Sequence, residues 1–214
     1  MKIDEIRVIS GQSIVLIIND VRYRLAVEAW AEKKFKKGGE LTETDFDFIV
    51  NESLKWLAKD YILRKLSISQ KSKVVLKSKT KIKILNWLKE NKIDFKTDRL
   101  EELIDIELNK LEENKIIDDN QYVANFINKS KRKSNRQIEY ELKNKGISGD
   151  AVRQALAERE NGEEEVIRNL ISKKLKNNNK LSFGERGKLI ASLIRRGFSI
   201  DKVKSLIDER VKKK

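Results

Sequence analysis

Alternating apolar and polar residues at the start of the chain predict β-strands. In VRYRLAV, residues 21–27, apolar side chains alternate with two arginines, which is the pattern of a strand buried on one face. IRVIS and SIVLIIN, earlier in the chain, are rich in β-branched residues, and the turn formers Gly11 and Asn19-Asp20 separate these stretches. We expect a three-stranded antiparallel meander over residues 3–27, then a short helix that ends in a left-handed glycine cap at Gly38-Gly39.

From Thr42 onward the apolar positions follow the period of an α-helix. Several stretches place apolar residues at i, i+1, i+4 and i+5, which gives one apolar stripe along a helix. They are Leu57, Ala58, Tyr61 and Ile62; Tyr122, Val123, Phe126 and Ile127; and Val166, Ile167, Leu170 and Ile171. The chain contains no proline, so no helix is interrupted by a missing backbone donor.

A second pattern recurs at a constant offset along the chain. KNKGISGDAVRQAL, residues 143–156, returns as IRRGFSIDKVKSLI, residues 194–207. Gly146 aligns with Gly197 and Val152 with Val203, each at an offset of 51 residues. Self-similarity at a fixed period indicates one supersecondary unit that is used more than once.

Serines and glycines mark the ends of the repeated helices. Glycine tolerates positive φ, so Gly146 and Gly197 should end the second helix of their units. The next residues, Ile147 and Phe198, should fold back onto that helix. Four serines are the predicted N-caps, two of them in capping boxes with the residue three positions on: Ser134 with Gln137, Ser182 with Glu185, Ser148 and Ser199.

Each unit is therefore predicted to hold three helices. A degenerate first copy precedes two clear ones, and in it Asn91-Lys92 stands where the later units have a glycine turn. We expect a mainly α protein: three tandem three-helix, helix-turn-helix-like repeats in an elongated array, preceded by a small N-terminal antiparallel β element. The predicted divisions are residues 1–50 for the β-meander and short helix, then 51–117, 118–160 and 161–214 for the repeats.

The composition excludes much enzyme chemistry. The 214 residues include no cysteine and no histidine, which excludes disulfides, most zinc sites and Ser-His-Asp mechanisms. No Gly-rich nucleotide-binding motif is present, so we expect no cofactor and no enzymatic activity. Because no stretch approaches the roughly 20 apolar residues of a membrane span and the start lacks a signal-peptide pattern, we expect a cytoplasmic protein. We also expect a monomer.

Asp118-Asp119 is the most suggestive acidic pair. Paired carboxylates can bind a metal ion. The favoured interpretation is that Asp118 caps the helix that carries Tyr122, where negative charge also suits the helix dipole. We therefore predict no metal site.

The charge is strongly positive and unevenly distributed. The formal net charge is +14, yet residues 1–50 carry 8 basic and 9 acidic side chains. Such asymmetry favours a polyanionic partner for the rest of the chain, while an idle basic surface is the alternative.

Basic clusters recur at the joint between the first and second helices of each unit. They are QKSKVVLKSKTKIK, NKSKRKSNRQ and SKKLKNNNK, the last of which includes Lys176 and Lys180. Their recurrence predicts a binding ridge for phosphates or for an acidic groove, whereas lysines at helix C-termini can also serve the helix dipole alone. The candidate binding residues are Lys129, Lys131, Arg132, Lys133, Arg136, Lys145, Lys173, Lys174, Arg195 and Arg196.

The middle unit resembles the core of the RecX regulatory proteins. LEENKIIDDNQYVANFINKSKRKSNRQIEYELKNKGISGDAVRQAL is similar to that family's pattern, through Asp118-Asp119, Tyr122 and the Lys-Gly-Ile at residues 145–147. LIASLIRRGFSIDKVKSLI is similar to its closing repeat, and the resemblance covers residues 52–210. One departure is Ser134-Asn135, at a joint where many members have glycine.

The resemblance implies a modulator of the RecA recombinase. Such proteins bind RecA filaments on single-stranded DNA and reduce ATP hydrolysis and strand exchange, in DNA repair and the SOS response. The implied partners are the RecA filament and single-stranded DNA, with duplex DNA as a further candidate. The alternative is a helix-turn-helix protein that reads duplex DNA, although the third helices begin with acids and offer few base-reading side chains.

Overall fold

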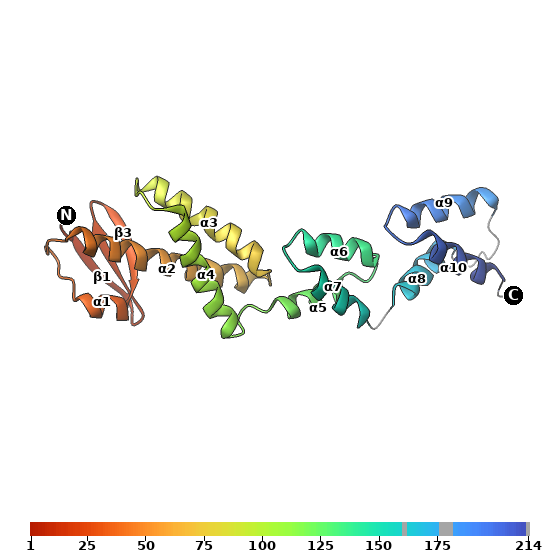
Figure 1. Cartoon of the computed structure of the whole chain (residues 1–214), viewed down its shortest axis with the longest axis horizontal. Helices are drawn as coiled ribbons and strands as arrows, with labels where there is room; N and C mark the ends of the chain where they lie inside the picture. Colours follow the sequence, from red (N-terminus) through yellow and green to blue (C-terminus); the bar gives the residue numbers. More distant parts are fainter. Residues whose placement is uncertain (160–161, 176–181, 213–214) are drawn as a thin grey trace. The chain divides into compact units, whose positions relative to one another are not determined.

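The computed structural model describes residues 1–159, 162–175 and 182–212, which form three β-strands and ten α-helices (Figure 1). The chain is mainly helical with a small antiparallel sheet at its start, as predicted. It divides into two compact units, Met1–Ile117 and Asp118–Lys214. The first contains β1 (Glu5–Ser10), β2 (Ser13–Ile18), β3 (Val21–Ala26), α1 (Val27–Lys33), α2 (Glu43–Ile68), α3 (Lys73–Glu90) and α4 (Thr97–Glu113).

The N-terminal sheet is the predicted meander. Its order is β1-β2-β3, and both strand pairs are antiparallel. The β2–β3 hairpin turns at Asn19 and Asp20, whose φ angles of 49° and 64° are those of a two-residue type I′ turn. Because side chains alternate along a strand, the register puts five buried apolar residues of β2 and β3 on one face: Ile14, Leu16, Ile18, Tyr23 and Leu25. Ser13 and Val15 of β2 are also buried, on the other face.

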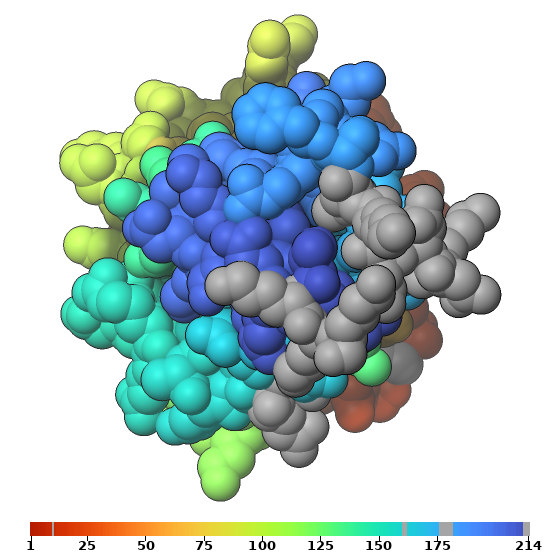
Figure 2. All heavy atoms as spheres, turned by 90° about the vertical axis from the view of Figure 1, so that its right-hand side faces the viewer, coloured from red at the N-terminus to blue at the C-terminus, as the bar shows by residue number. Residues whose placement is uncertain are grey.

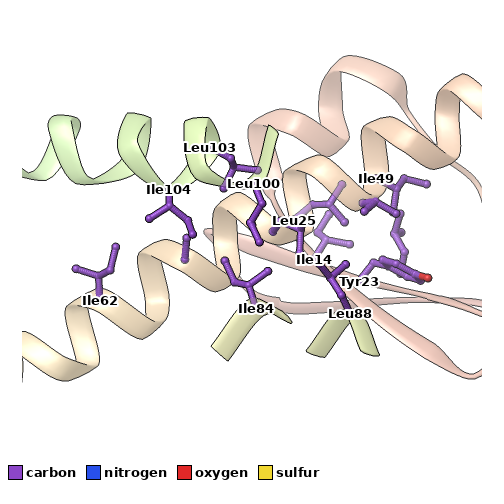
Figure 3. Packing of buried hydrophobic residues seen from close by; sticks show 14 of the residues in the cluster. Ile14, Tyr23, Leu25, Ile49, Ile62, Ile84, Leu88, Leu100, Leu103 and Ile104 are labelled. Carbon is purple, nitrogen blue, oxygen red and sulfur yellow. The ribbon is translucent and has the colours of Figure 1, made fainter. Parts of the chain in front are cut away.

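This face of the sheet and the first three-helix repeat share one hydrophobic core. Side chains from the sheet, α2, α3 and α4 point into it together (Figure 3). Helix α2 begins with a capping box at Thr42, and its buried residues run from Ile49 to Ile62. The helix packs on β3 as well as on α3 and α4 (Figure 1). It therefore joins the sheet to the helix pair.

The shared core differs from the expected separation of residues 1–50 from the first repeat. The expected boundary lies inside α2, where Ile49, Val50 and Leu54 are all buried. Helical periodicity locates an apolar stripe, but it does not tell how many elements cover that stripe. Here both the sheet and the other helices cover it.

Helix α1 ends earlier than predicted. Its left-handed C-cap is Lys34, with φ of 51°, and not the glycine pair at 38–39. The next residue, Phe35, packs against the core and accepts a hydrogen bond from Trp30 Nε1 at 3.2 Å, so the chain leaves the helix there. The glycine pair instead holds the N-terminal segment, because Ile3 exchanges backbone hydrogen bonds with Gly38 and Gly39.

The second unit holds two three-helix repeats, each with its own small core. In the C-terminal repeat, the last two helices lie against each other (Figure 2). The predicted apolar stripes face these cores, with Val123 and Ile127 buried in one repeat and Val166, Ile167 and Ile171 in the other. The elements are α5 (Asp119–Lys129), α6 (Asn135–Lys143), α7 (Gly149–Ala157), α8 (Glu163–Leu175), α9 (Phe183–Ile194) and α10 (Ile200–Lys212).

The same left-handed turn joins the second helix to the third in every repeat. The residue with positive φ is Lys92 (55°), Gly146 (76°) or Gly197 (86°). The residue after it donates its N–H to the carbonyl five positions earlier, which satisfies an otherwise unpaired group at the helix end. These residues are Ile93, Ile147 and Phe198, at 3.0, 3.2 and 3.3 Å. Ile147 and Phe198 are buried, as predicted.

Most of the predicted N-caps form. The hydroxyls of Ser134, Ser148 and Ser182 each accept a backbone N–H in the first turn of their helix. Of the two predicted capping boxes, the one at Ser182 is complete and the one at Ser134 is not. In α6, Gln137 donates its side-chain amide to Glu141 at 3.1 Å instead of returning to the cap.

The two repeats of the second unit meet where the α5–α6 connection and the first turn of α6 contact the turn after α9. We call this contact the polar joint. The buried Ser134 accepts the Gln137 N–H at 3.2 Å and donates its hydroxyl to the Arg196 carbonyl at 2.7 Å. Gly197 approaches so closely that a Cβ there would lie 2.7 Å from Ser134 Oγ and 3.8 Å from the Cβ of Arg136. The turn of α9 therefore rests on the first turn of α6.

Arg159 binds the same joint. Its guanidinium donates to the Ser130 carbonyl at 3.2 Å and to Asn135 Oδ1 at 3.0 Å. Glu163 accepts the Asn135 backbone N–H at 2.9 Å. Burial lowers the pKa of Arg159, and the nearby Glu163 carboxylate opposes this effect. Side chains from the end of one repeat and the start of the next thus satisfy the backbone of the joint.

The shared core predicts that residues 1–50 cannot be removed without cost. Their deletion removes the sheet that packs on α2, and fully exposing one side chain of the size of Leu54 costs about 1.5–3 kcal/mol. We expect the 51–214 fragment to lose helical circular dichroism from its first repeat, whereas the 118–214 fragment should melt cooperatively. Unchanged helicity per residue in the 51–214 fragment would contradict the single core.

The joint predicts that Gly197→Ala destabilises the second unit through two separable effects. Placing alanine in the left-handed region costs about 1–2 kcal/mol, and the added Cβ meets Ser134 Oγ at 2.7 Å. In a Ser134→Gly background only the backbone cost should remain, since glycine is an acceptable N-cap. Urea denaturation of the four variants of this cycle measures the difference. Equal costs in both backgrounds would show that the contact contributes nothing.

Candidate binding interface

The first unit pairs many of its lysines internally. Three lysines of α3, at i, i+4 and i+8, face acidic residues of the antiparallel helix α4. The pairs are Lys73–Glu112, Lys77–Asp105 at 2.6 Å and Lys81–Glu101. The Lys81 ammonium holds the pKa of Glu101 below its usual value. Three of the six lysines in the first predicted basic cluster are therefore paired within their own unit.

The second unit carries the larger positive excess. Residues 118–214 have 24 basic and 14 acidic side chains, net +10, against 24 and 20, net +4, in residues 1–117. Ion pairs in the second unit use other cations than most of the predicted ones: Arg153 with Glu139, Arg168 with Glu209, Arg186 with Asp208 and Lys202 with Glu163.

Most of the candidate cations are exposed and form no ion pair with a carboxylate of the described residues. Lys129 ends α5, and Lys131 and Arg132 follow it in the joint. Lys173 and Lys174 lie in the last turn of α8, at the other end of the helix from Glu163, which contacts the joint. Arg136 lies in the first turn of α6, and Arg195 and Arg196 follow α9. Lys176 and Lys180 lie outside the described residues.

Two candidates are engaged within their own repeat. Lys133 pairs with Glu141 at 2.5 Å, and its ammonium lies 5.2 Å from the ring centre of Phe126. The Lys145 ammonium lies 6.0 Å from the same ring. Cations over an aromatic face are attracted to it. The Phe126 ring therefore attracts both Lys133, which precedes α6, and Lys145, which follows it. These two lysines have a structural role beside any binding role.

The polar joint collects several candidate arginines. The segment that carries Arg195 and Arg196 lies against the first turn of α6. Two contacts hold it there: the Ser134–Arg196 hydrogen bond and the approach of Gly197 to Arg136. Arg132 precedes that turn in the same joint. Arginine presents a planar fork of donors that suits phosphate or carboxylate oxygens, so this arrangement can bind an extended anion.

Sequence reasoning missed Arg159 and the serines that shape the joint. Arg159 stands after the third helix, where nothing in the sequence pattern signals a contact with residues 130–135. Ser134 was recognised as a helix cap, but its bond to the Arg196 carbonyl spans 62 residues. The excess of basic residues was the one sequence feature that indicated a candidate binding region here.

The acidic pair behaves as a helix cap. Asp118 Oδ1 accepts the Gln121 N–H at 2.8 Å. Burial raises the pKa of Tyr122, and the Asp119 carboxylate adds to this effect. Within the described ranges, no group of three or more potential ligands is placed to hold a metal ion. None of the helices in the described part of the chain combines the length and apolar character that crossing a bilayer requires.

Comparison with known proteins relates both the sequence and the fold to one family. Residues 162–207 match a family model described as RecX, third three-helix domain. A crystal structure of regulatory protein RecX matches with a TM-score of 0.66 and 21% identity, covering 97% of this chain and 98% of that chain. RecX from Lactobacillus salivarius matches with a TM-score of 0.58 and 21% identity, covering 73% of this chain and 96% of that chain. No curated protein sequence matches the chain.

The matched domain coincides with helices α8, α9 and most of α10, the repeat that closes the chain. At 21% identity the crystal structures show a shared fold, and the matched domain adds the sequence evidence. The resemblance to the RecX family is therefore confirmed: the chain contains the third three-helix domain of RecX and has the fold of RecX regulatory proteins.

Proposed function

We propose that this protein binds RecA filaments on single-stranded DNA and lowers their ATP hydrolysis and strand exchange. The observation that carries the proposal is the set of exposed arginines at the joint of the second unit, which no carboxylate of the described residues neutralises. The first unit shows that this chain can pair its cations when acids are placed opposite them. The charge left on the second unit is available for a partner.

Two kinds of partner surface suit these arginines. The phosphates of single-stranded DNA attract spaced cations with little regard for sequence. Carboxylates in a groove of the recombinase would be bound by the same planar forks. The family to which the matched domain belongs is described as regulatory, and a protein that acts by binding needs contacts of this kind. In this proposal the protein lowers ATP hydrolysis because it occupies the filament.

Replacing Arg132, Arg136, Arg195 and Arg196 together by glutamine should abolish most of the inhibition of recombinase ATP hydrolysis. Glutamine keeps the length and helix propensity but removes the charge. Because all four side chains are exposed, we expect the free energy of unfolding to change by about 0.5 kcal/mol or less per site. Steady-state ATP hydrolysis on single-stranded DNA and thermal melting measure the two effects.

The matched control replaces four other exposed lysines by glutamine: Lys36, Lys59, Lys89 and Lys204. This control removes four positive charges that do not belong to the joint, and it should inhibit nearly as well as the parent. If the arginine variant still inhibits like the parent, the joint is not the binding site. If the parent itself does not inhibit, the proposed function is wrong.

Binding to single-stranded DNA should weaken steeply with salt and vary little with sequence. Each phosphate contact contributes a slope of about −0.7 in a plot of log affinity against log salt, so the four-arginine variant should show a shallower slope. Fluorescence anisotropy with several unrelated oligonucleotides, across a salt series, measures both properties. A strong preference for one duplex sequence would instead favour a helix-turn-helix protein that reads duplex DNA.

A further inference from the structure

Exposed aromatic rings are scarce in this protein. In the part of the chain that the structure describes, every aromatic side chain is at least partly buried except Tyr140, 67% exposed, and Phe183, 92% exposed. Both belong to second helices of their repeats, Tyr140 to α6 and Phe183 to α9. The other rings serve the cores or lie under lysines and arginines.

Tyr140 lies on a face of α6 that is turned away from the core. Arg136, Tyr140 and Lys143 occupy positions i, i+4 and i+7, so they line one side of the helix, and all three are exposed. The buried residues Ile138 and Leu142 lie on the opposite side. With a rise of about 1.5 Å per residue, the two cations stand about 10 Å apart along the helix, with the ring between them.

The charge of this face is positive without compensation from its neighbours. The adjacent Glu139 is engaged by Arg153 at 3.5 Å, and Glu141 by Lys133 at 2.5 Å. Among the described residues, no carboxylate pairs with Arg136 or Lys143, and the Tyr140 hydroxyl has no hydrogen-bond partner. The same face continues to the joint, because Arg136 adjoins Gly197.

An exposed ring between two cations fits a single-stranded nucleic acid. A base can stack on the ring because every base has a π-face, while the flanking phosphates meet the cations. Single exposed apolar residues are common and need no partner. This ring differs from such a residue because its helix face supplies the matching charge on both sides.

Phe183 differs from Tyr140 in the cations that the described part of its helix provides. Its neighbours one turn further along α9 are Arg186 and Gly187. The Arg186 guanidinium is already bound to Asp208 at 2.5 Å, and glycine offers no side chain. Within the described residues, this exposed ring has no unpaired cation one turn away on its helix, so Phe183 serves as the control.

We propose that Tyr140 is a stacking platform for one base of single-stranded DNA, with Arg136 and Lys143 as its phosphate contacts. The inference rests on the proposed binding of single-stranded DNA and adds the residue that contacts a base. Stacking on an aromatic side chain is worth about 1–3 kcal/mol per base, which corresponds to about a 5-fold or greater change in affinity. It carries no sequence preference.

The test compares the full-length parent with Tyr140→Leu, Tyr140→Phe and Phe183→Leu. Anisotropy is measured at one salt concentration with labelled oligothymidine and with an abasic oligonucleotide of the same length, which keeps the phosphates but has no bases. On oligothymidine, Tyr140→Leu should bind about 5-fold or more weakly, while Tyr140→Phe and Phe183→Leu should stay within about 2-fold of the parent. On the abasic strand all four proteins should bind alike.

Several outcomes overturn the assignment. Parent-like binding of Tyr140→Leu to oligothymidine means that the ring does not stack. An equal loss on the abasic strand means that the ring acts through the fold or the phosphates. An equal loss in Phe183→Leu contradicts the choice of this helix face. If the parent binds neither strand, the DNA-binding part of the proposed function fails, and the stacking role fails with it; binding of the parent to oligothymidine separates that failure from the others.

Discussion

Each three-helix repeat depends on one backbone constraint, a residue with positive φ at the end of its second helix. That conformation reverses the chain and lets the following residue bond back to the helix and enter the core. Glycine adopts it at little cost in the two later repeats. Lysine does so in the first repeat, where the larger core that includes the sheet provides more stabilisation. Without this reversal the third helix would have no apolar surface to cover.

The packing of the helices also determines which basic side chains are paired with acidic ones. The acidic face of α4 pairs with three lysines of α3, whereas the second unit has no comparable acidic helix opposite its joint within the described residues. A basic run in the sequence therefore has two different fates in one protein. Only the neighbouring helix decides whether such a run holds the fold together or remains available to a partner.

Local signals in the sequence predicted most local structure. Alternation in residues 21–27 predicted the sheet, and Gly146 and Gly197 predicted the helix ends, because these features depend on nearby residues alone. The shared core of the sheet and α2 could not be predicted, since it depends on which elements meet in space. The same limit applies to the candidate site. Its cations were visible as composition, but Arg159 and the bond of Ser134 to the Arg196 carbonyl join distant parts of the chain.

The 26-residue helix α2 also restricts how this protein can change during evolution. Its buried stripe contacts the sheet and, further along, the α3–α4 pair. One inserted residue between those contacts would rotate everything beyond it by about 100° and shift it by about 1.5 Å, which would turn one set of apolar residues toward water. Insertions and deletions in this lineage should therefore accumulate in the connections between helices, and the length of α2 should stay constant.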